Sequence, residues 1–200
     1  MFTMIVMPKK RLILASNSPR RIVLLKSLGY HFDVVPHDIE ECIYGDILPM
    51  KLVRNLALLK ASDVARKVDN AVIISADTVV VHEKTIFGKP KDVSDAKRIL
   101  SILSDSKHDI ISGVCVMEMP SRKKMLRIER THIKMRHIKD EEIEKYILTG
   151  EPMDKAGAYA IQGEGRKFIE KIDGSYSNAV GLPLELLKEM LDHFTSDKNA

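Results

Sequence analysis

The sequence predicts an α/β protein whose sheet mixes parallel and antiparallel strands. Strand-like apolar runs alternate with amphipathic helical runs early in the chain, which is typical of parallel α/β units. Two long segments rich in β-branched residues, 108–119 and 125–135, then follow one another and favour an antiparallel hairpin. No linker-like stretch interrupts the chain. We therefore expect residues 1–200 to form a single domain, built as two lobes with a cleft between them.

Capping and turn residues divide the first part of the chain. Pro19 suits a first helical position, because its missing N–H costs nothing there, and Gly29 ends that helix. Asp77 follows directly on a buried strand and marks its C-terminal end. With their apolar patterns, these signals predict strands at 11–15, 30–35, 71–75, 79–82 and 85–87, and helices at 19–28 and 49–67.

The second part of the chain holds fewer helical signals. Ser94 is expected to cap a helix that runs to Leu103. Residues 120–124 form the turn of the hairpin, and Gly150 ends a short helix. The remaining predicted elements are that helix at 140–148, a strand at 167–172 and a last helix at 183–194.

Composition limits the classes of function. A formal net charge of +4 is too small to argue for nucleic acid as a partner. Cys42 and Cys115 stand in no metal-binding or redox spacing, which indicates reduced thiols and a cytoplasmic protein. The apolar start precedes its basic residues, the reverse of a secretory signal. No run approaches the roughly 18 apolar residues of a membrane span, so we expect no membrane partner.

Several catalytic templates are absent from the sequence. The Gly88-Lys89 pair is followed by proline, so it is no nucleotide-binding P-loop of the G-x-x-x-x-G-K-[ST] type. Gly163 and Gly165 lack the third glycine of a dinucleotide fingerprint. The histidines show no H-E-x-x-H spacing. These exclusions leave short polar segments at the ends of elements as candidate sites.

The first such segment is Ser16-Asn17-Ser18-Pro19-Arg20-Arg21, between a strand and a helix. A helix N-terminus attracts anions, and two arginines there can fork onto phosphate oxygens. The alternative is a capped helix with two solvated arginines. The second segment holds Asp77, whose carboxylate can bind a metal ion or accept a proton from water, or can simply form a turn. Lys89, in its Gly-Lys-Pro turn, offers a point charge for phosphate or lies in an ordinary surface turn.

Two later segments and one acidic pair likewise have both a functional and a purely structural interpretation. In the stretch 150–163, Gln162 either reads a base edge or satisfies a nearby backbone group. The Gly- and Ser-rich stretch 174–183 either approaches phosphate through its N–H groups or is only a loop. Glu40 and Glu41 supply oxygen ligands for a divalent ion, or are solvated. The residues alone indicate an anion-binding enzyme.

These segments, in this order, resemble the Maf family of nucleotide pyrophosphatases. The similar stretches are LASNSPRR, ISADTVV, GKP, EPMDKAGAYAIQG and KIDGSYSNAVGLP, spanning Arg11 to Pro183. The resemblance implies a two-lobed α/β fold similar to that of inosine triphosphate pyrophosphatases, with the active-site cleft between the lobes. It also implies hydrolysis of the α–β phosphoanhydride of a nucleoside triphosphate with Mg²⁺ or Mn²⁺, and it leaves a homodimer open.

The resemblance also implies roles for individual residues. Asp77 matches the proton acceptor of the family, and it is also a candidate metal ligand. The positions tied to base specificity match Arg20, Thr78 and Gln162. The positions that contact phosphate or metal match Ser16, Arg21, Glu40, Lys60 and Lys89. Glu41 is the alternative to Glu40 as the acidic ligand.

With SPRR, ADT and IQG intact, the chain is similar to the dTTP/UTP subgroup, in a role that clears nucleotide pools of unwanted or modified members. It departs in the segment Ile111-Ser112-Gly113-Val114, where that subgroup more often has a threonine and an alanine. The main rival is a nucleic-acid- or protein-binding regulator of cell division without nucleotide turnover; a phosphatase that releases orthophosphate is a weaker one.

Overall fold

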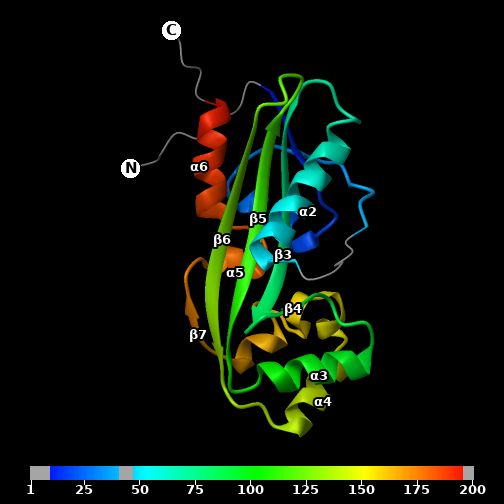
Figure 1. Cartoon of the computed structure of the whole chain (residues 1–200), viewed down its shortest axis with the longest axis vertical. Coiled ribbons are helices and arrows are strands. Elements are labelled where there is room, and N and C mark those ends of the chain that lie inside the picture. Colours follow the sequence, from blue (N-terminus) through cyan, green and yellow to red (C-terminus); the bar gives the residue numbers. More distant parts are fainter. Residues whose placement is uncertain (1–9, 41–46, 196–200) are drawn as a thin grey trace. The chain divides into compact units, whose positions relative to one another are not determined.

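The computed structural model describes residues 10–40 and 47–195, and its strands form one seven-stranded sheet (Figure 1). The strands are β1 (Arg11–Leu14), β2 (Asp33–Val34), β3 (Ala71–His82), β4 (Thr85–Phe87), β5 (Lys107–Glu118), β6 (Lys124–Met135) and β7 (Ile169–Asp173). Their order is β2-β1-β3-β5-β6-β7, with β4 paired to β3. β1 is parallel to β2 and β3, whereas β4 is antiparallel to β3 and β7 to β6. The sheet is mixed, as predicted.

Six α-helices and three short 3₁₀ helices complete the described part of the chain. They are α1 (Pro19–Ser27), α2 (Pro49–Val64), α3 (Val93–Leu103), α4 (Asp140–Leu148), η1 (Glu151–Asp154), η2 (Ala156–Ala158), η3 (Glu164–Phe168), α5 (Tyr176–Val180) and α6 (Leu184–Thr195). None of the helices within residues 10–40 and 47–195 is long and apolar enough to span a bilayer.

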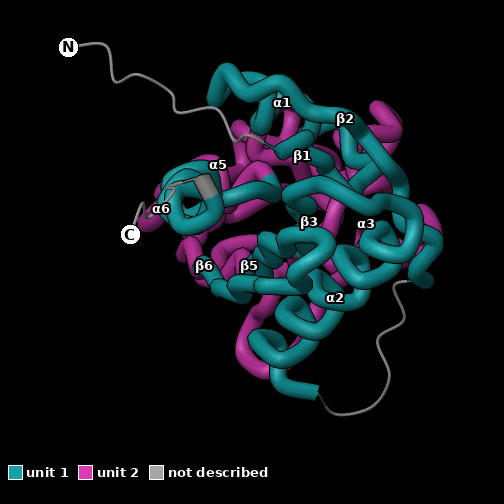
Figure 2. Tube along the Cα trace, turned by 90° about the horizontal axis from the view of Figure 1, so that it is seen from above, with its two compact units in different colours: residues 1–77, 112–129, 181–200 teal, residues 78–111, 130–180 magenta. Residues whose placement is uncertain are grey.

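The chain divides into two compact units (Figure 2). Unit 1 comprises residues 1–77, 112–129 and 181–200, and unit 2 comprises residues 78–111 and 130–180. The chain passes from unit 1 to unit 2 within β3, between Asp77 and Thr78.

In unit 1 the strands are covered on both faces, because successive side chains of a strand point to opposite sides. One core cluster joins Leu12, Leu14, Val72 and Ile74 to buried residues of α1 and α6. The other cluster joins the alternate strand residues, such as Ile13 and Ile73, to Ala57, Ala61 and Val64 of α2. The odd-numbered residues of β3 therefore face α2, and this parity decides where Asp77 points.

Unit 2 holds the second half of β3 with β4, β7 and the helices α3, α4 and α5. Helix α4 packs against α3 and η1. Its Tyr146 is fully buried and meets the ring of Phe168 edge-on, with the ring centroids 5.1 Å apart. This aromatic pair fixes α4 against η3.

The structure corrects the predicted bounds of several elements. The strand expected at 30–35 is only the two-residue β2. Asp77 lies inside a continuous 12-residue strand, not at a strand end, because β-branched residues on both sides keep the backbone extended. Asp92, not Ser94, caps α3, since its side chain accepts from the N–H of Asp95 at 2.8 Å. Helix α2 ends at Val64, three residues early, and the last strand starts at Ile169 because η3 precedes it.

Candidate active site

The centre of the candidate site in unit 1 is a buried ion pair. Nζ of Lys60 donates to Oδ1 of Asp77 at 2.7 Å, with Lys60 fully buried and Asp77 only 5% exposed. Asp77 has the odd-numbered parity on β3, so its side chain faces α2, and Lys60 is on that helix. Removing two charges from water is costly unless they are paired, so this contact is what permits a carboxylate at this depth. Among the described residues, no group donates a hydrogen bond to the other oxygen, Oδ2.

Helix α2 lies close enough to the strands for this pair because of two small residues. Ser75, two positions before Asp77, donates from its Oγ to the carbonyl oxygen of Ala57 at 2.6 Å. Gly113 of β5 passes so near the backbone of α2 that a Cβ there would overlap the carbonyl oxygen of Val53. The tight packing fixes the turn of α2 that carries Lys60.

The turn between β1 and α1 lies at the same edge of the unit 1 sheet as Asp77. β1 and β3 are parallel, and Leu14 pairs with Ile74. The N–H of Ala15 donates to the carbonyl oxygen of Ile74 at 2.7 Å, so the pairing continues past the end of β1. By this register, Ser16 is level with Ala76, one residue before Asp77. The structure thus brings two predicted site segments together.

This turn has the form of an anion-binding helix start. The buried Ser16 accepts at its Oγ from the N–H of Ser18 at 3.1 Å, and Ser18 caps α1 by accepting from the N–H of Arg21. Nε of Arg21 donates to the carbonyl oxygen of Gly181 at 2.9 Å, while Arg20 is half-buried beside it. Helix N-terminal N–H groups and guanidinium groups both favour phosphate oxygens.

Glu40 is exposed, on a segment that is anchored to α2 just before it. The carboxylate of Asp63 accepts from the N–H of Asp38 at 3.1 Å, and Lys67 bonds to both Asp38 and Asp63. The N–H of Asp38, the Lys67 ammonium and the Arg66 guanidinium lower the pKa of Asp63 to about 2. The helix that carries Lys60 therefore also holds the start of the Glu40 segment. Glu41 lies outside the described residues.

Unit 2 holds the other three predicted site residues. Thr78 is half-buried on β3, and Lys89 is exposed in the turn after β4. The carbonyl oxygen of Gly88 accepts from the N–H of Gly157 at 3.0 Å, so that turn is tied to η2. A Cβ on Gly157 would lie 2.8 Å from Cγ2 of Val80. In unit 2, the turn of Lys89 and the segment that leads to Gln162 therefore pack beside the part of β3 that begins at Thr78.

The polar side chains of the stretch 174–183 serve the fold of unit 2. Nδ2 of the fully buried Asn178 donates to the carbonyl oxygen of Ile110 at 3.2 Å and to Oγ1 of Thr131 at 2.9 Å. Oγ1 of Thr131 in turn donates to the carbonyl oxygen of Ser175. These bonds tie α5 to β5 and β6. These side chains thus have a structural use, while an approach of this stretch to phosphate through its backbone N–H groups stays a prediction.

Asp77 and Glu40 have the donor chemistry of a metal site that a substrate would complete. The described residues contain no group of three or more His, Cys, Asp or Glu side chains that would enclose an ion. Mg²⁺ is usually held by one or two carboxylates and completed by phosphate oxygens and water. Asp77, whose Oδ2 is without a donor among the described residues, has the donor chemistry for such a site, and exposed Glu40 offers a second carboxylate.

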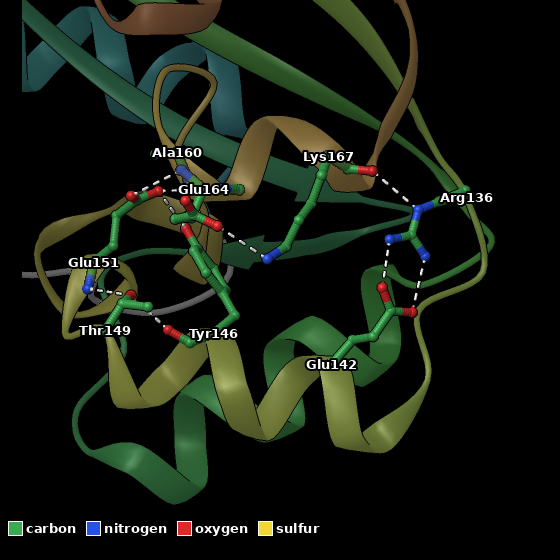
Figure 3. A network of polar contacts seen from close by, with 9 residues as sticks. Arg136, Glu142, Tyr146, Thr149, Glu151, Ala160, Glu164 and Lys167 are labelled. Atoms are coloured by element: carbon green, nitrogen blue, oxygen red, sulfur yellow. Dashed lines mark hydrogen bonds and ion pairs between the residues drawn. The ribbon is translucent and has the colours of Figure 1, made fainter.

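Sequence reasoning missed two residues that hold the Gln162 segment. Tyr146 and Glu151 bond to each other and to backbone N–H groups on either side of Gln162 (Figure 3). The signal in the sequence is the pair Gly163 and Gly165. A Cβ on Gly163 would lie within 3 Å of the Glu151 carboxylate, and a Cβ on Gly165 would lie within 3 Å of the Tyr146 hydroxyl.

Comparison with known proteins identifies the family of the chain. The profile of the family described as Maf-like protein matches residues 11–194. The chain is 52% identical to a dTTP/UTP pyrophosphatase of Dictyoglomus turgidum, over 93% of this chain and 97% of that protein. It is 50% identical to a dTTP/UTP pyrophosphatase of Alkaliphilus metalliredigens, over 92% of this chain and 97% of that protein.

A solved structure supports the fold alone. The Ham1 protein of Staphylococcus aureus aligns over 92% of this chain and 99% of its own, with a TM-score of 0.54 at 15% identity. The fold class predicted from the sequence is thereby confirmed. On the family profile and the relatives together, this chain belongs to the Maf family.

Proposed function

We propose that the protein hydrolyses the α–β phosphoanhydride of dTTP and UTP, and of related modified nucleotides, to the nucleoside monophosphate and pyrophosphate. Membership of the Maf family and the dTTP/UTP pyrophosphatases among its relatives support this reaction. The observation that carries the chemistry is the buried Lys60–Asp77 pair, which leaves one carboxylate oxygen without a donor among the described residues. A regulator without turnover is not favoured, because the relatives are named as enzymes.

In the proposed reaction, water adds across the phosphoanhydride. A new P–O bond forms, the bridging P–O bond breaks, and the proton of the water is released. Asp77 either accepts that proton or would hold the metal ion, which would lower the pKa of the water when bound. Both roles use Oδ2, since Lys60 holds Oδ1. Lys60 keeps the carboxylate in one orientation, which is the positioning a displacement at phosphorus requires.

The proposed cofactor is Mg²⁺ or Mn²⁺, bound by Asp77, Glu40 and oxygens of the triphosphate. When bound, such an ion offsets the negative charge that develops on the phosphoryl oxygens. Ser16, Arg21 and Lys89 are the proposed phosphate contacts, and Arg20, Thr78 and Gln162 the proposed contacts to the nucleoside. Each of these groups donates hydrogen bonds or positive charge where the substrate is negative or carries carbonyl oxygens.

The proposed setting is the cytoplasm, where nucleoside triphosphates are made and consumed. Light scattering during gel filtration tests the homodimer that the resemblance leaves open. A single mass near 22.6 kDa would exclude it.

The experiment that tests the reaction is hydrolysis of a nucleotide panel in ¹⁸O-labelled water, with and without EDTA. We expect UTP and dTTP to give monophosphate and pyrophosphate, with one ¹⁸O atom per turnover in one of the two products. The labelled product identifies the phosphorus that water attacks. Orthophosphate as the first product, or full activity in EDTA, contradicts the proposal.

A further inference from the structure

The segment that carries Gln162 joins η2 to η3 in unit 2. Its side chain is exposed, whereas the preceding Ile161 is buried. Among the described residues, none forms a hydrogen bond with the Gln162 amide. This observation speaks against the alternative that Gln162 serves a nearby backbone group. The question is then what holds the backbone under this amide in place.

After Gln162, the backbone is held by the carboxylate of Glu151. Oε2 accepts from the N–H of Glu164 at 3.0 Å, and Oε1 accepts from the N–H of Gly165 at 3.1 Å (Figure 3). These are the first N–H groups of η3, which have no partner inside that helix. Burial acts to raise the pKa of Glu151, but the hydrogen bonds from Glu164, Gly165 and Tyr146 outweigh it and lower the pKa.

Before Gln162, the backbone is held by the hydroxyl of Tyr146. This oxygen accepts from the N–H of Ala160 at 3.0 Å and donates to Oε1 of Glu151 at 2.9 Å. The Tyr146 hydroxyl and the Glu151 carboxylate are thus hydrogen-bonded to each other, and together they hold the backbone at both ends of the segment 161–163. Gly150 places Glu151 there, because its left-handed backbone (φ 75°) turns the chain directly after α4.

Two glycines allow the backbone to come this close. A Cβ on Gly163 would lie 2.5 Å from Oε2 of Glu151, and a Cβ on Gly165 would lie 2.7 Å from the hydroxyl oxygen of Tyr146. Gly163 also has φ of 109°, a conformation that side chains with a Cβ rarely adopt. The close approach is therefore built into the sequence around Gln162.

We infer that Glu151, together with Tyr146, is a positioning residue that fixes the Gln162 amide and thereby sets the base preference of the enzyme. This inference rests on the proposed function, in which Gln162 contacts the uracil or thymine edge. A side-chain amide discriminates between bases only when its donor and acceptor are held in place. Cytosine has an amino donor where uracil has a carbonyl oxygen, and a fixed amide meets one of them mismatched.

The test compares kcat/KM for UTP and CTP in the parent and in Glu151→Gln. The substitution keeps the size of the side chain, but its NH₂ group now faces a backbone N–H where a carboxylate oxygen stood. We expect the UTP/CTP ratio to fall about tenfold, mainly through loss of UTP turnover, because an unpaired polar group costs this order of discrimination. Gln162→Ala should lower the ratio equally, and the double variant should lower it no further.

Glu142→Gln is the matched control. It removes a negative charge from another carboxylate that stabilises unit 2. The Glu142 carboxylate accepts hydrogen bonds from both terminal nitrogens of Arg136, at 2.6 and 3.0 Å (Figure 3). We expect it to lower the melting temperature while leaving the UTP/CTP ratio unchanged. A ratio that falls equally in Glu142→Gln shows that general destabilisation, not positioning, explains the effect and overturns the inference.

The remaining outcomes separate the inference from the function on which it rests. A parent protein that releases no pyrophosphate from any nucleotide contradicts the proposed function itself. A parent that prefers UTP and loses that preference in Gln162→Ala, but keeps it in Glu151→Gln, overturns the inference alone.

If Glu151→Gln does not fold, Tyr146→Phe replaces it. This variant removes only the hydroxyl that joins Ala160 to Glu151. We expect the ratio to fall and the amides of residues 160–165 to exchange their hydrogens faster. Unchanged exchange together with an unchanged ratio overturns the inference.

Discussion

Nζ of Lys60, on α2, lies 2.7 Å from Oδ1 of Asp77, in the middle of β3, and both side chains are almost wholly buried. The contact follows from the alternation of the strand, which turns Asp77 toward α2, and from the close packing of α2 through Ser75 and Gly113. One oxygen of the carboxylate is thereby fixed. The proposed chemistry uses the other oxygen.

Asp77→Asn keeps the size of the side chain and removes its charge and basicity. We expect kcat to fall by roughly 10²–10⁴-fold if Asp77 accepts the proton, and further if it also binds the metal. Calorimetric titration of the variant with Mn²⁺ separates the two roles. Unchanged metal affinity indicates the base, and weakened affinity indicates the ligand. Turnover within a fewfold of the parent would falsify both roles.

Lys60→Met keeps the length of the side chain but leaves Asp77 buried without its cation. Breaking a buried pair from one side costs about 3–5 kcal/mol of unfolding free energy. Urea unfolding measures this loss. The double variant Lys60→Met/Asp77→Asn serves as the control, and it should recover part of the loss because no uncompensated charge remains. A single variant as stable as the parent would show that the pair is not buried in solution.

Apolar periodicity and capping residues report on local structure, so they predict most strands and helices of unit 1. The strand expected at 30–35 is the exception, since β2 covers only Asp33–Val34. The sequence favours a strand end for Asp77, since aspartate is rare in strand interiors. The ion pair that permits it there joins residues 17 positions apart in the chain, and no local pattern shows that contact. The cap of α3 is Asp92 and not Ser94, because serine and aspartate both suit an N-cap and the residue type alone does not fix the first residue of the helix.

The Tyr146–Glu151 support of the Gln162 segment is a contact that helical and strand patterns do not predict. Glu151 bonds to N–H groups 13 and 14 positions later, so neither helical nor strand spacing predicts the contact. In the sequence, Gly163 and Gly165 form an incomplete dinucleotide motif, and Gly163 also ends the IQG motif of the family resemblance. Their role is instead to let the backbone approach two side chains. The predicted residue roles, the metal and the single two-lobed domain with its cleft stay predictions.

Gly113→Ala tests the packing of α2 on β5. The added Cβ would overlap the carbonyl oxygen of Val53, which is backbone and moves only with the helix. We expect a loss of about 1–3 kcal/mol in unfolding free energy, as for other overpacked cores. Activity should fall as well, because a shift of α2 moves Lys60. Equal stability and activity in the variant would show that α2 is not held as closely as described.

The carboxylate of Asp63 makes the free energy of unfolding depend on pH in the acidic range. Its pKa in the folded protein is lowered to about 2 from 3.8, so its stabilisation is complete above pH 3.8 and is lost as the pH falls toward 2. Asp63→Asn should therefore destabilise the protein by about 1–3 kcal/mol near pH 7. The difference from the parent should narrow between pH 4 and pH 2. Unfolding measured across this range checks it, and a difference independent of pH would argue against the assignment.

The most direct measurement of the central proposal is a ³¹P NMR time course of UTP with the protein and Mg²⁺. We predict that the monophosphate and pyrophosphate signals grow together in equal amounts, with no nucleoside diphosphate and no orthophosphate. In a parallel run, Asp77→Asn should leave UTP nearly unchanged. Diphosphate with orthophosphate as the first products, or the same time course from Asp77→Asn, would contradict the account.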